Sequence, residues 1–329
     1  MLRSLPNLAQ AACGNFLSSR LAVSPPDEIS EDAWEHGFRS RPFPPGGQCM
    51  LVSVILSTYN SPEWLEKVLW GYAVQTYRDF EILVADDGSD QRTALVLGRM
   101  RRLTKIVIRH VWHEDRGFRK AVILNRATAD AAGDYLVFTD GDCIPRHDFL
   151  ETHVALARPG CLLSGGCVRL PRGTSERIEP ADILARRITD LEWLEAAGAA
   201  RARGLRMLRA GRWTARLFDA LTTTRPTWNG CNSSTYRRHV LDVNGHDERL
   251  RYGGGDREMG ERLVNLGIRP VQVRYRAVCL HLDHDRPYAN AESWRENHEI
   301  RDSIRSNRAT WTTHGIEQAD RPARRRVAA

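Results

Sequence analysis

Residues 133–143 have the sequence GDYLVFTDGDC, in which a short apolar run leads directly into two aspartates. The run from Tyr135 to Thr139 has the length and aromatic content of a strand that is buried on both faces. Asp140 and Asp142 would lie at its carboxyl end, where their charges repel each other and a divalent cation would relieve the repulsion. Asp-Gly is also common turn chemistry. This stretch alone therefore favours a metal-binding strand end and a simple turn equally.

Strand and helix patterns alternate in the chain before this stretch. Ser61 and Pro62 form a good N-cap and first-turn pair for the first helix. The alternation predicts an α/β fold with a mostly parallel, Rossmann-like sheet flanked by helices. Strand-like runs occupy 51–57, 80–85 and 105–111, and helical patterns occupy 63–74, 92–103 and 119–131.

Polar residues follow three of the expected strands. The carboxyl ends of parallel strands share one edge of a sheet, so these residues are expected to converge there, which favours a ligand site over a turn. The sequence lacks GxGxxG after the first strand and lacks GxxxxGK[ST], which argues against a dinucleotide-binding fold and a P-loop. The polar residues are Thr58, Tyr59 and Asn60, then Asp86 and Asp87, then Asp140 and Asp142.

Composition restricts the partners and the location. The formal net charge of +7 suits an anionic partner such as nucleotide phosphate, nucleic acid or an acidic membrane surface. The seven cysteines include no CxxC pair, which argues against a zinc ribbon or redox motif and favours reduced thiols. No apolar run reaches the ~18 residues of a membrane span, and no secretory signal is evident. We expect a cytoplasmic protein, at most peripheral to the cytoplasmic membrane face.

Three segments, in this order, resemble glycosyltransferase family 2, whose members have the GT-A fold: SVILSTYN (53–60), ILVADDGSD (82–90) and YLVFTDGDC (135–143). The resemblance implies that the first two segments hold the nucleoside of a sugar nucleotide. It implies that the third, a DxD-type motif, holds the metal that bridges the pyrophosphate. The implied nucleotide-sugar contacts are Thr58, Tyr59, Asn60, Asp87 and Asp140, and the implied metal ligands are Asp140 and Asp142.

Basic residues at 116–120 (RGFRK) precede the third expected helix. Arg116 and Lys120 could meet the phosphates of a donor there. A solvated helix start is an equally good interpretation, because charged side chains are mostly exposed.

Residues 176–223 lack strand signals and are rich in Leu, Ala and Arg. A basic amphipathic helix can lie on an anionic membrane. The favoured alternative is a solvated face of helices packed on the sheet. The arginines without an intervening acid are Arg201, Arg203, Arg206, Arg209, Arg212 and Arg216.

Three later segments, GCN (230–232, within the strand-like run 228–234), GHDERL (245–250) and YGGGD (252–256), resemble the C-terminal part of β-1,4-galactosyltransferases and bacterial lipopolysaccharide-type glycosyltransferases. The resemblance implies that Asp256 is the base that deprotonates the acceptor hydroxyl. An N-cap of the following helix is the alternative role. The relatives commonly have Glu-Asp where this chain has Gly255-Asp256. The implied acceptor contacts are Trp228, Asn232, Gly254 and Gly255.

A histidine-containing segment, VCLHLDH (278–284), follows the last expected strand. The galactosyltransferase resemblance implies that a histidine here completes the metal site, with His281 preferred and His284 as the alternate. Imidazole is a softer ligand than carboxylate, so Mn²⁺ is favoured over Mg²⁺.

The predicted architecture is one large GT-A domain with an acceptor-side subregion. Its parts are a flexible leader (1–49), a nucleotide-sugar-binding half (50–170), a helical basic insertion (171–227), an acceptor and catalytic half (228–290), and a C-terminal helix and tail (291–329).

The resemblance implies a bacterial, metal-dependent, inverting hexosyltransferase of polysaccharide biosynthesis. A nucleotide-diphosphate sugar, with UDP favoured, would be the donor, and a saccharide or lipid-linked saccharide would be the acceptor. No nucleic-acid partner is expected. The alternatives are a metal-dependent nucleotidyltransferase and a non-catalytic anion-binding module.

Overall fold

The computed structural model describes residues 50–285 and 291–317. The leader predicted at 1–49 and the tail predicted beyond residue 317 lie outside the described residues.

A seven-stranded sheet forms the centre of the described fold, with the strand order β3-β2-β1-β4-β8-β6-β9. Every neighbouring pair is parallel except the two pairs made by β8. The predicted α/β fold with a mostly parallel sheet is therefore confirmed. The strands are β1 (Val52–Thr58), β2 (Phe80–Asp86), β3 (Val107–Trp112), β4 (Tyr135–Asp140), β6 (Cys161–Ser164), β8 (Ser233–Tyr236) and β9 (Arg269–Gln272).

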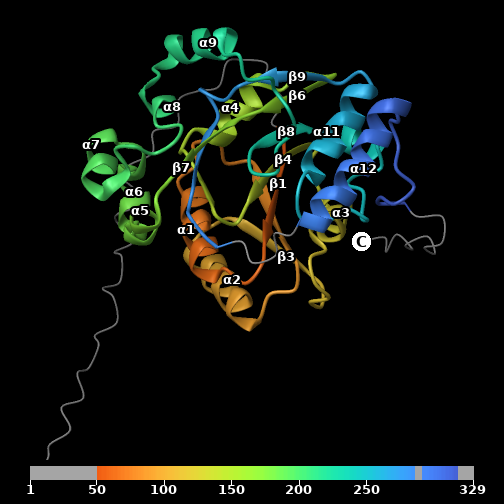
Figure 1. Ribbon diagram of the computed structural model, residues 1–329. Coiled ribbons are helices and arrows are strands. Elements are labelled where there is room, and N and C mark those ends of the chain that lie inside the picture. The colour runs from red at the N-terminus through yellow and green to blue at the C-terminus, as the bar shows by residue number, and fades with distance from the viewer. Residues whose placement is uncertain (1–49, 286–290, 318–329) are drawn as a thin grey trace, which may run out of the picture. The chain divides into compact units, whose positions relative to one another are not determined.

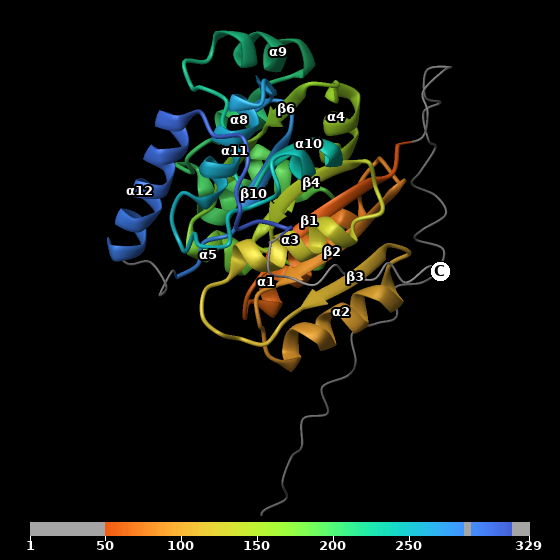
Figure 2. The same cartoon turned by 90° about the vertical axis from the view of Figure 1, so that its right-hand side faces the viewer.

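Helices cover both faces of the sheet. Figure 1 shows α1 to the left of the sheet and α3 and α11 to its right, and Figure 2 views the molecule from the side that carries α3. The first face packs against α1 (Pro62–Ala73) and α2 (Gln91–Leu103). The second face packs against α3 (Lys120–Asp130), α10 (Arg237–Asp242) and α11 (Gly255–Asn265).

The apolar centre of β1 follows from the position of the strand between two layers of helices. Val54 and Leu56 belong to the core under α1 and α2, whereas Ile55 belongs to the core under α3. Successive side chains of a strand point to opposite faces, so a strand covered on both sides needs apolar residues on both. The helix after β1 spans Pro62–Ala73, one residue earlier at each end than the predicted 63–74, and the Ser61 side chain does not cap it. The Ser61 hydroxyl donates to the Tyr59 carbonyl at 3.2 Å instead.

A second sheet of three strands has the order β5-β10-β7. Its strands are β5 (Cys143–Pro145), β10 (Val278–His281) and β7 (Gly166–Arg169). Strand β10 is antiparallel to β5 and parallel to β7. Because β5 starts directly after Asp142, this sheet brings a segment near residue 280 against the end of β4.

The region at 171–227 is made of short helices in the structure. Helix α9 lies at the top of Figure 1, at the outside of this region. Helix α4 (Phe149–Leu156) precedes the region, and α12 (Ala291–Asn307) packs on α11, where Arg301 pairs with Glu261 at 2.6 Å. The helices within the region are α5 (Arg172–Arg177), α6 (Pro180–Leu184), α7 (Leu191–Leu194), α8 (Arg206–Arg209) and α9 (Arg212–Leu221), with a 3₁₀ turn at Arg187–Thr189 and a π turn at Glu195–Ala199.

Candidate active site

The polar strand ends meet at one rim of the main sheet, as predicted. Asp140 is the register partner of Ser57, and Asp86 is the register partner of Thr58. A Cβ atom at Gly141 would lie 3.0 Å from the Thr58 hydroxyl oxygen, so the glycine between the two aspartates allows the chain to pass close to β1. The hydroxyl of Thr58 is buried and has no hydrogen-bond partner among the described residues.

Asp140 is held by two donors. The Ser57 hydroxyl and the Lys120 ammonium group both lie 2.7 Å from its Oδ1 atom. Burial by itself lowers the pKa of Lys120, but the charges of Asp140, Asp256 and Asp142 outweigh burial and raise that pKa well above its usual value. Lys120 is therefore a permanent positive charge that is influenced by two aspartates at the end of β4 and by Asp256 from a distant segment.

Asp142 lies beside two imidazoles. Its Oδ2 atom is 2.8 Å from Nε2 of His284 and 3.8 Å from Nε2 of His281. One ligand atom from each of the three residues fits within 4.8 Å. Burial by itself raises the pKa of Asp142, but the hydrogen bond from His284 and the charge of His281 lower it below its usual value. The structure thus brings together both histidines that the sequence offered as alternatives.

Asp87 has a rigid setting at the end of β2. Its Oδ1 atom lies 2.7 Å from Nε2 of His113, and its Oδ2 atom accepts the backbone N–H of Arg119 at 2.9 Å. Burial raises the pKa of Asp87, although both partners act in the opposite direction. The preceding Asp86 is fully buried and contacts His110 at 2.8 Å, so the two neighbouring aspartates have different roles.

The segment after β1 is tied to the turn after β2. The Asn60 backbone N–H donates to the Ser89 hydroxyl at 2.9 Å, and the Asn60 Oδ1 atom accepts the Asp90 N–H at 3.0 Å. Tyr59 stays partly exposed, and its hydroxyl donates to Asp115 at 2.9 Å. The hydrogen bond to this carboxylate and partial burial raise the pKa of Tyr59. The phenol group is therefore tied to Asp115 while the ring stays accessible to solvent.

Asp256 lies in the first turn of α11, and Gly254 occupies the N-cap position. The capping alternative for Asp256 is therefore wrong. Gly253 and Gly254 have φ values of 107° and 85°, which L side chains rarely adopt, so this sharp entry into the helix requires glycines. The Asp256 Oδ2 atom accepts the backbone N–H of Gly230 at 3.0 Å. A Cβ atom at Gly230 would lie 2.9 Å from the carboxylate oxygens, so only glycine allows this approach.

Three predicted residues lie away from this group. Trp228 is only 1% exposed and packs edge-on against Phe138, with 5.2 Å between the ring centroids. Asn232 is fully buried, and its amide donates to the backbone carbonyls of Gly166 and Ala277. Both therefore support the core behind the rim. Arg116 forms an exposed ion pair with Glu114 at 2.8 Å.

Sequence reasoning missed Ser57 and His113. Ser57 is buried within the apolar run of β1, and its position opposite Asp140 follows only from the strand register. His113 stands one residue after the end of β3, which is the same position after a strand that drew attention to the aspartates. The polar-strand-end criterion would have found it.

Comparisons with known proteins agree with this geometry. Residues 53–213 match the family model described as glycosyl transferase family 2. Validoxylamine A glucosyltransferase of Streptomyces hygroscopicus subsp. jinggangensis is 28% identical over 260 residues, which cover 74% of this chain and 58% of that protein. The uncharacterized glycosyltransferase YfnE of Bacillus subtilis is 27% identical over 282 residues, which cover 75% of this chain and 69% of that protein.

A solved structure of S. aureus TarS (1-349) in complex with UDP superposes with a TM-score of 0.53 at 15% identity, covering 79% of this chain and 68% of that chain. This likeness concerns the fold. The matched part of the chain belongs to glycosyltransferase family 2, a family of sugar-transferring enzymes, and its fold is the GT-A fold. The chain spans little more than half the length of the validoxylamine A glucosyltransferase that it matches. Among the described residues, no helix has the length and apolarity needed to cross a bilayer.

Proposed function

We propose that this chain is a metal-dependent inverting glycosyltransferase that moves a sugar from a nucleoside-diphosphate donor to a hydroxyl of a saccharide or lipid-linked saccharide. The observation that carries the proposal is the group of Asp142, His281 and His284, whose ligand atoms lie within 4.8 Å of one another, with Asp140 paired to Lys120 at 2.7 Å beside it. The charge of Asp256, from a distant segment, also raises the pKa of Lys120, so one rim combines two neighbouring aspartates with a third carboxylate. UDP is the favoured nucleotide, because TarS, which shares the fold, forms complexes with UDP and UDP-GlcNAc.

The nucleoside would bind over the ends of β1 and β2. Asp87 suits this role because His113 and the Arg119 N–H fix its carboxylate in one orientation. Tyr59, which is partly exposed beside it, offers a ring face for the base. Asn60 ties the segment that carries Tyr59 to the turn after β2.

The donor set of Asp142, His281 and His284 fits a divalent transition metal. One carboxylate and two imidazoles suit Mn²⁺ better than Mg²⁺, which prefers oxygen ligands. A bound Mn²⁺ would offset negative charge on the leaving diphosphate. Asp140 would contribute as a further ligand, since its carboxylate also lies within 4.8 Å of that of Asp142, and Lys120 would add a fixed positive charge near the phosphates.

Asp256 would act as the general base. The acceptor hydroxyl oxygen forms a bond to the anomeric carbon while the bond from that carbon to the diphosphate oxygen breaks. The hydroxyl proton passes to the Asp256 carboxylate, and the nucleoside diphosphate leaves with the bonding electron pair. Attack from the face opposite the leaving group inverts the anomeric centre, so no second carboxylate nucleophile is required.

A thermal-shift screen with UDP, GDP and CMP, each with and without Mn²⁺, tests the donor site. We expect stabilisation by a nucleoside diphosphate that depends on Mn²⁺, followed by release of that diphosphate from a matching sugar nucleotide. Release of pyrophosphate from a nucleoside triphosphate would instead indicate a nucleotidyltransferase. Stabilisation by many unrelated anions without metal would indicate an anion-binding module, and no stabilisation by any nucleotide would contradict the proposal.

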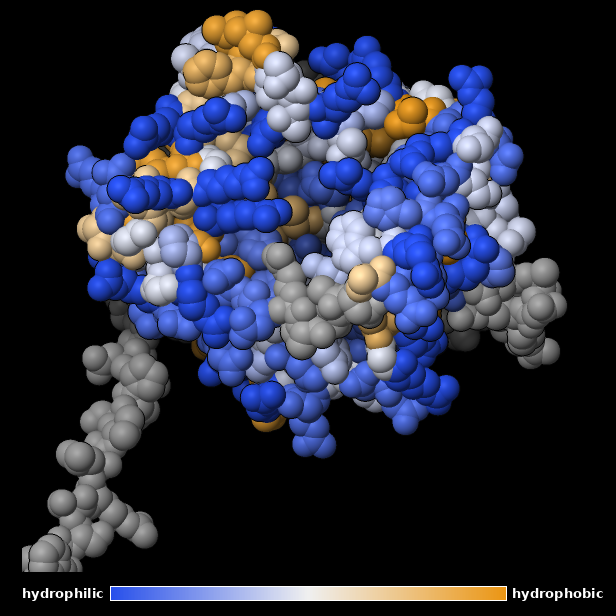
Figure 3. Space-filling view, viewed as in Figure 1, coloured by the Kyte–Doolittle hydropathy of each residue, from blue (hydrophilic) through white to orange (hydrophobic). Residues whose placement is uncertain are grey.

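We also propose that α9 contacts an anionic membrane surface. Four large apolar side chains of α9 are exposed, which is unusual for a helix on a sheet protein and argues against a purely solvated polar face. Figure 3 shows hydrophobic side chains gathered at the top of the view, where α9 lies. These side chains are Trp213 (77% exposed), Leu217 (53%), Phe218 (42%) and Leu221 (68%).

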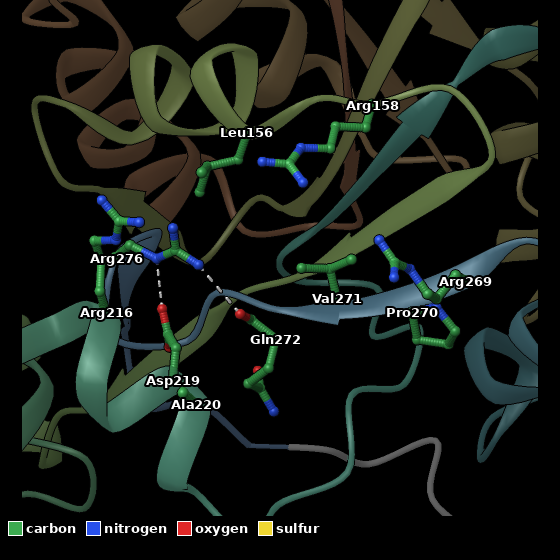
Figure 4. Close-up of a pocket in the computed structure, with 10 residues that line it drawn as sticks. All are labelled: Leu156, Arg158, Arg216, Asp219, Ala220, Arg269, Pro270, Val271, Gln272 and Arg276. Atoms are coloured by element: carbon green, nitrogen blue, oxygen red, sulfur yellow. Dashed lines mark hydrogen bonds and ion pairs between the residues drawn. The ribbon is translucent and has the colours of Figure 1, made fainter.

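Arginines adjoin this apolar face. Arg216 lies over the Trp213 ring and also lines a pocket of about 500 Å³ between α9, α4 and β9. Four arginines and one aspartate line the pocket, and that aspartate, Asp219, is paired with Arg276 at 2.6 Å (Figure 4). An excess of positive charge beside an exposed apolar helix face suits anionic lipid headgroups. The arginines of the pocket are Arg158, Arg216, Arg269 and Arg276.

A further inference from the structure

Four cysteines from four separate segments meet behind the candidate active site. Cys143 begins β5, Cys231 lies just before β8, and Cys279 lies in β10. Their three sulfur atoms all lie within 4.8 Å of one another. Cys167 in β7 is the register partner of Cys279 on the parallel neighbour strand, so its side chain lies on the same face of the small sheet.

Two simpler explanations account for this cluster less well. Buried cysteines often serve as small apolar groups, but apolar packing does not require sulfur atoms to point at one another. A disulfide would join two of the four sulfurs and leave the others unused, and all four are free thiols in the structure. Convergence of three sulfurs, with a fourth beside them, is the arrangement that a thiolate-binding metal needs.

We propose that Cys143, Cys231 and Cys279, with Cys167 as the fourth ligand, bind Zn²⁺. Zinc–sulfur bonds of about 2.3 Å place the sulfurs of a tetrahedral site about 3.8 Å apart. Only a small contraction of Cys143, Cys231 and Cys279 is therefore required, and Cys167 would turn its sulfur toward them. Thiolate ligands select Zn²⁺ over the harder Mn²⁺. Binding releases the thiol protons to solvent. It also removes the hydrogen bond that the Cys143 thiol donates to Asp142 at 3.1 Å.

The zinc site would fasten together segments that carry the candidate catalytic groups. Cys143 directly follows Asp142, and Cys279 lies two residues before His281. Cys231 directly follows Gly230, whose N–H is held by Asp256. A metal that closes these long loops would therefore stabilise the rim of the site without touching the substrate. The inference rests on the cysteine geometry alone and does not depend on the proposed function.

Metal content tests the proposal directly. The full chain, purified without a histidine tag and dialysed against Mn²⁺, is expected to retain about one Zn²⁺ per chain, as a closed four-ligand site would. Cys231→Ser is expected to lose this zinc. Cys161→Ser is the control, because Cys161 is a free cysteine whose sulfur is contacted by Arg269, outside the cluster. The zinc should persist in Asp142→Ala, which separates this site from the carboxylate–histidine group.

A second measurement protects the test against misfolded variants. Replacement of the metal in the unmodified chain by Co²⁺ should give the intense near-ultraviolet thiolate-to-cobalt charge-transfer absorption and the strong visible bands of a tetrahedral site. Zinc that survives in Cys231→Ser, or an unmodified chain that binds Co²⁺ without the thiolate absorption, would overturn the proposal. Chelation of the zinc should also lower the midpoint of thermal unfolding of the unmodified chain. Chelation should lower the midpoint of Cys161→Ser to the same extent.

Discussion

The Asp256→Asn variant distinguishes a catalytic role of Asp256 from a purely structural one. The variant removes the ability of the side chain to accept a proton. It preserves an oxygen that can accept the Gly230 N–H, which Asp256 now accepts at 3.0 Å. The substitution also leaves Gly254 as the N-cap, so the start of α11 should not change. A large loss of turnover would then show that the Asp256 carboxylate takes part in the chemical step.

The expected magnitudes of the two roles differ. Loss of a general base lowers turnover by about 10²–10⁴-fold, which corresponds to about 2.7–5.5 kcal/mol of transition-state stabilisation. Complete loss of a hydrogen bond to a charged group costs about 1.5–3 kcal/mol, and it appears as lower stability. Asparagine retains the acceptor oxygen, so the stability change should be well below that range. Donor affinity should stay near that of the unmodified chain, because the nucleoside and metal groups lie on other segments.

The assay measures diphosphate release from the sugar nucleotide that the thermal-shift screen identifies, together with calorimetric UDP affinity in Mn²⁺. Asp242→Asn is the matched control, because Asp242 is an exposed aspartate at the end of α10. We expect collapse of turnover with intact UDP affinity in Asp256→Asn alone. Near-normal turnover in that variant would refute the base assignment and leave Asp256 as an anchor for the Gly230 segment.

Three further perturbations have defined outcomes. Asp142→Ala should abolish Mn²⁺-dependent UDP binding without unfolding the chain, and unchanged affinity in calorimetry would refute the metal assignment. Burial lowers the pKa of His153 from 6.5 to about 4, so the unfolded chain takes up this proton first as pH falls. Stability from this group is complete well above pH 6.5 and decreases by about 2 kcal/mol at pH 5. Urea unfolding should show a total decrease that includes His246, whose pKa burial also lowers to about 4. His153→Gln should remove about 2 kcal/mol of that decrease, and an unchanged decrease would contradict this assignment. Trp213→Ser combined with Leu217→Ser should reduce co-sedimentation with anionic liposomes at low salt, whereas Leu95→Ser, an exposed leucine on α2, should not; equal binding by all variants would exclude contact through α9.

The sheet and the convergence of its polar ends could be predicted from sequence, because both follow from general rules. Alternating strands and helices imply parallel pairing, and parallel strands end at one edge. These two rules are enough to predict that Asp140 lies beside the end of β1. Which oxygen each donor contacts could not be predicted, since Ser57 looks like an ordinary member of a buried strand until its register with β4 is known.

Side-chain direction was the main source of error. The segment at 228–234 lies beside the site, as its motif suggested, but Trp228 and Asn232 point into the core while Gly230 faces Asp256. A motif gives the position of a segment and does not state which residues face a ligand. The same limit applies to α9, where the spacing of Trp213 and Leu217 indicates an amphipathic helix but not that its apolar face is exposed.

The cysteine cluster could not be found by spacing rules. Zinc ribbons are recognised because paired cysteines lie close in sequence. Here Cys143, Cys167 and Cys279 are brought together only when β10 inserts between β5 and β7, and Cys231 joins them from the segment before β8. Long-range strand pairing of that kind leaves no local signature.

The antiparallel strand β8 has a consequence for the order in which the chain folds during synthesis. β8 joins β4 to β6, so the two parallel groups of strands become one sheet only when residues 233–236 are present. The segment that matches the family ends at residue 213, before this strand. While the ribosome makes the region between β6 and β8, the edge of β4 that β8 later covers has no partner, and β6 lacks both of its neighbours, β8 and β9. Unpaired strand edges promote association between chains, so a nascent chain stalled in the helical region would expose β6 and this edge of β4 together.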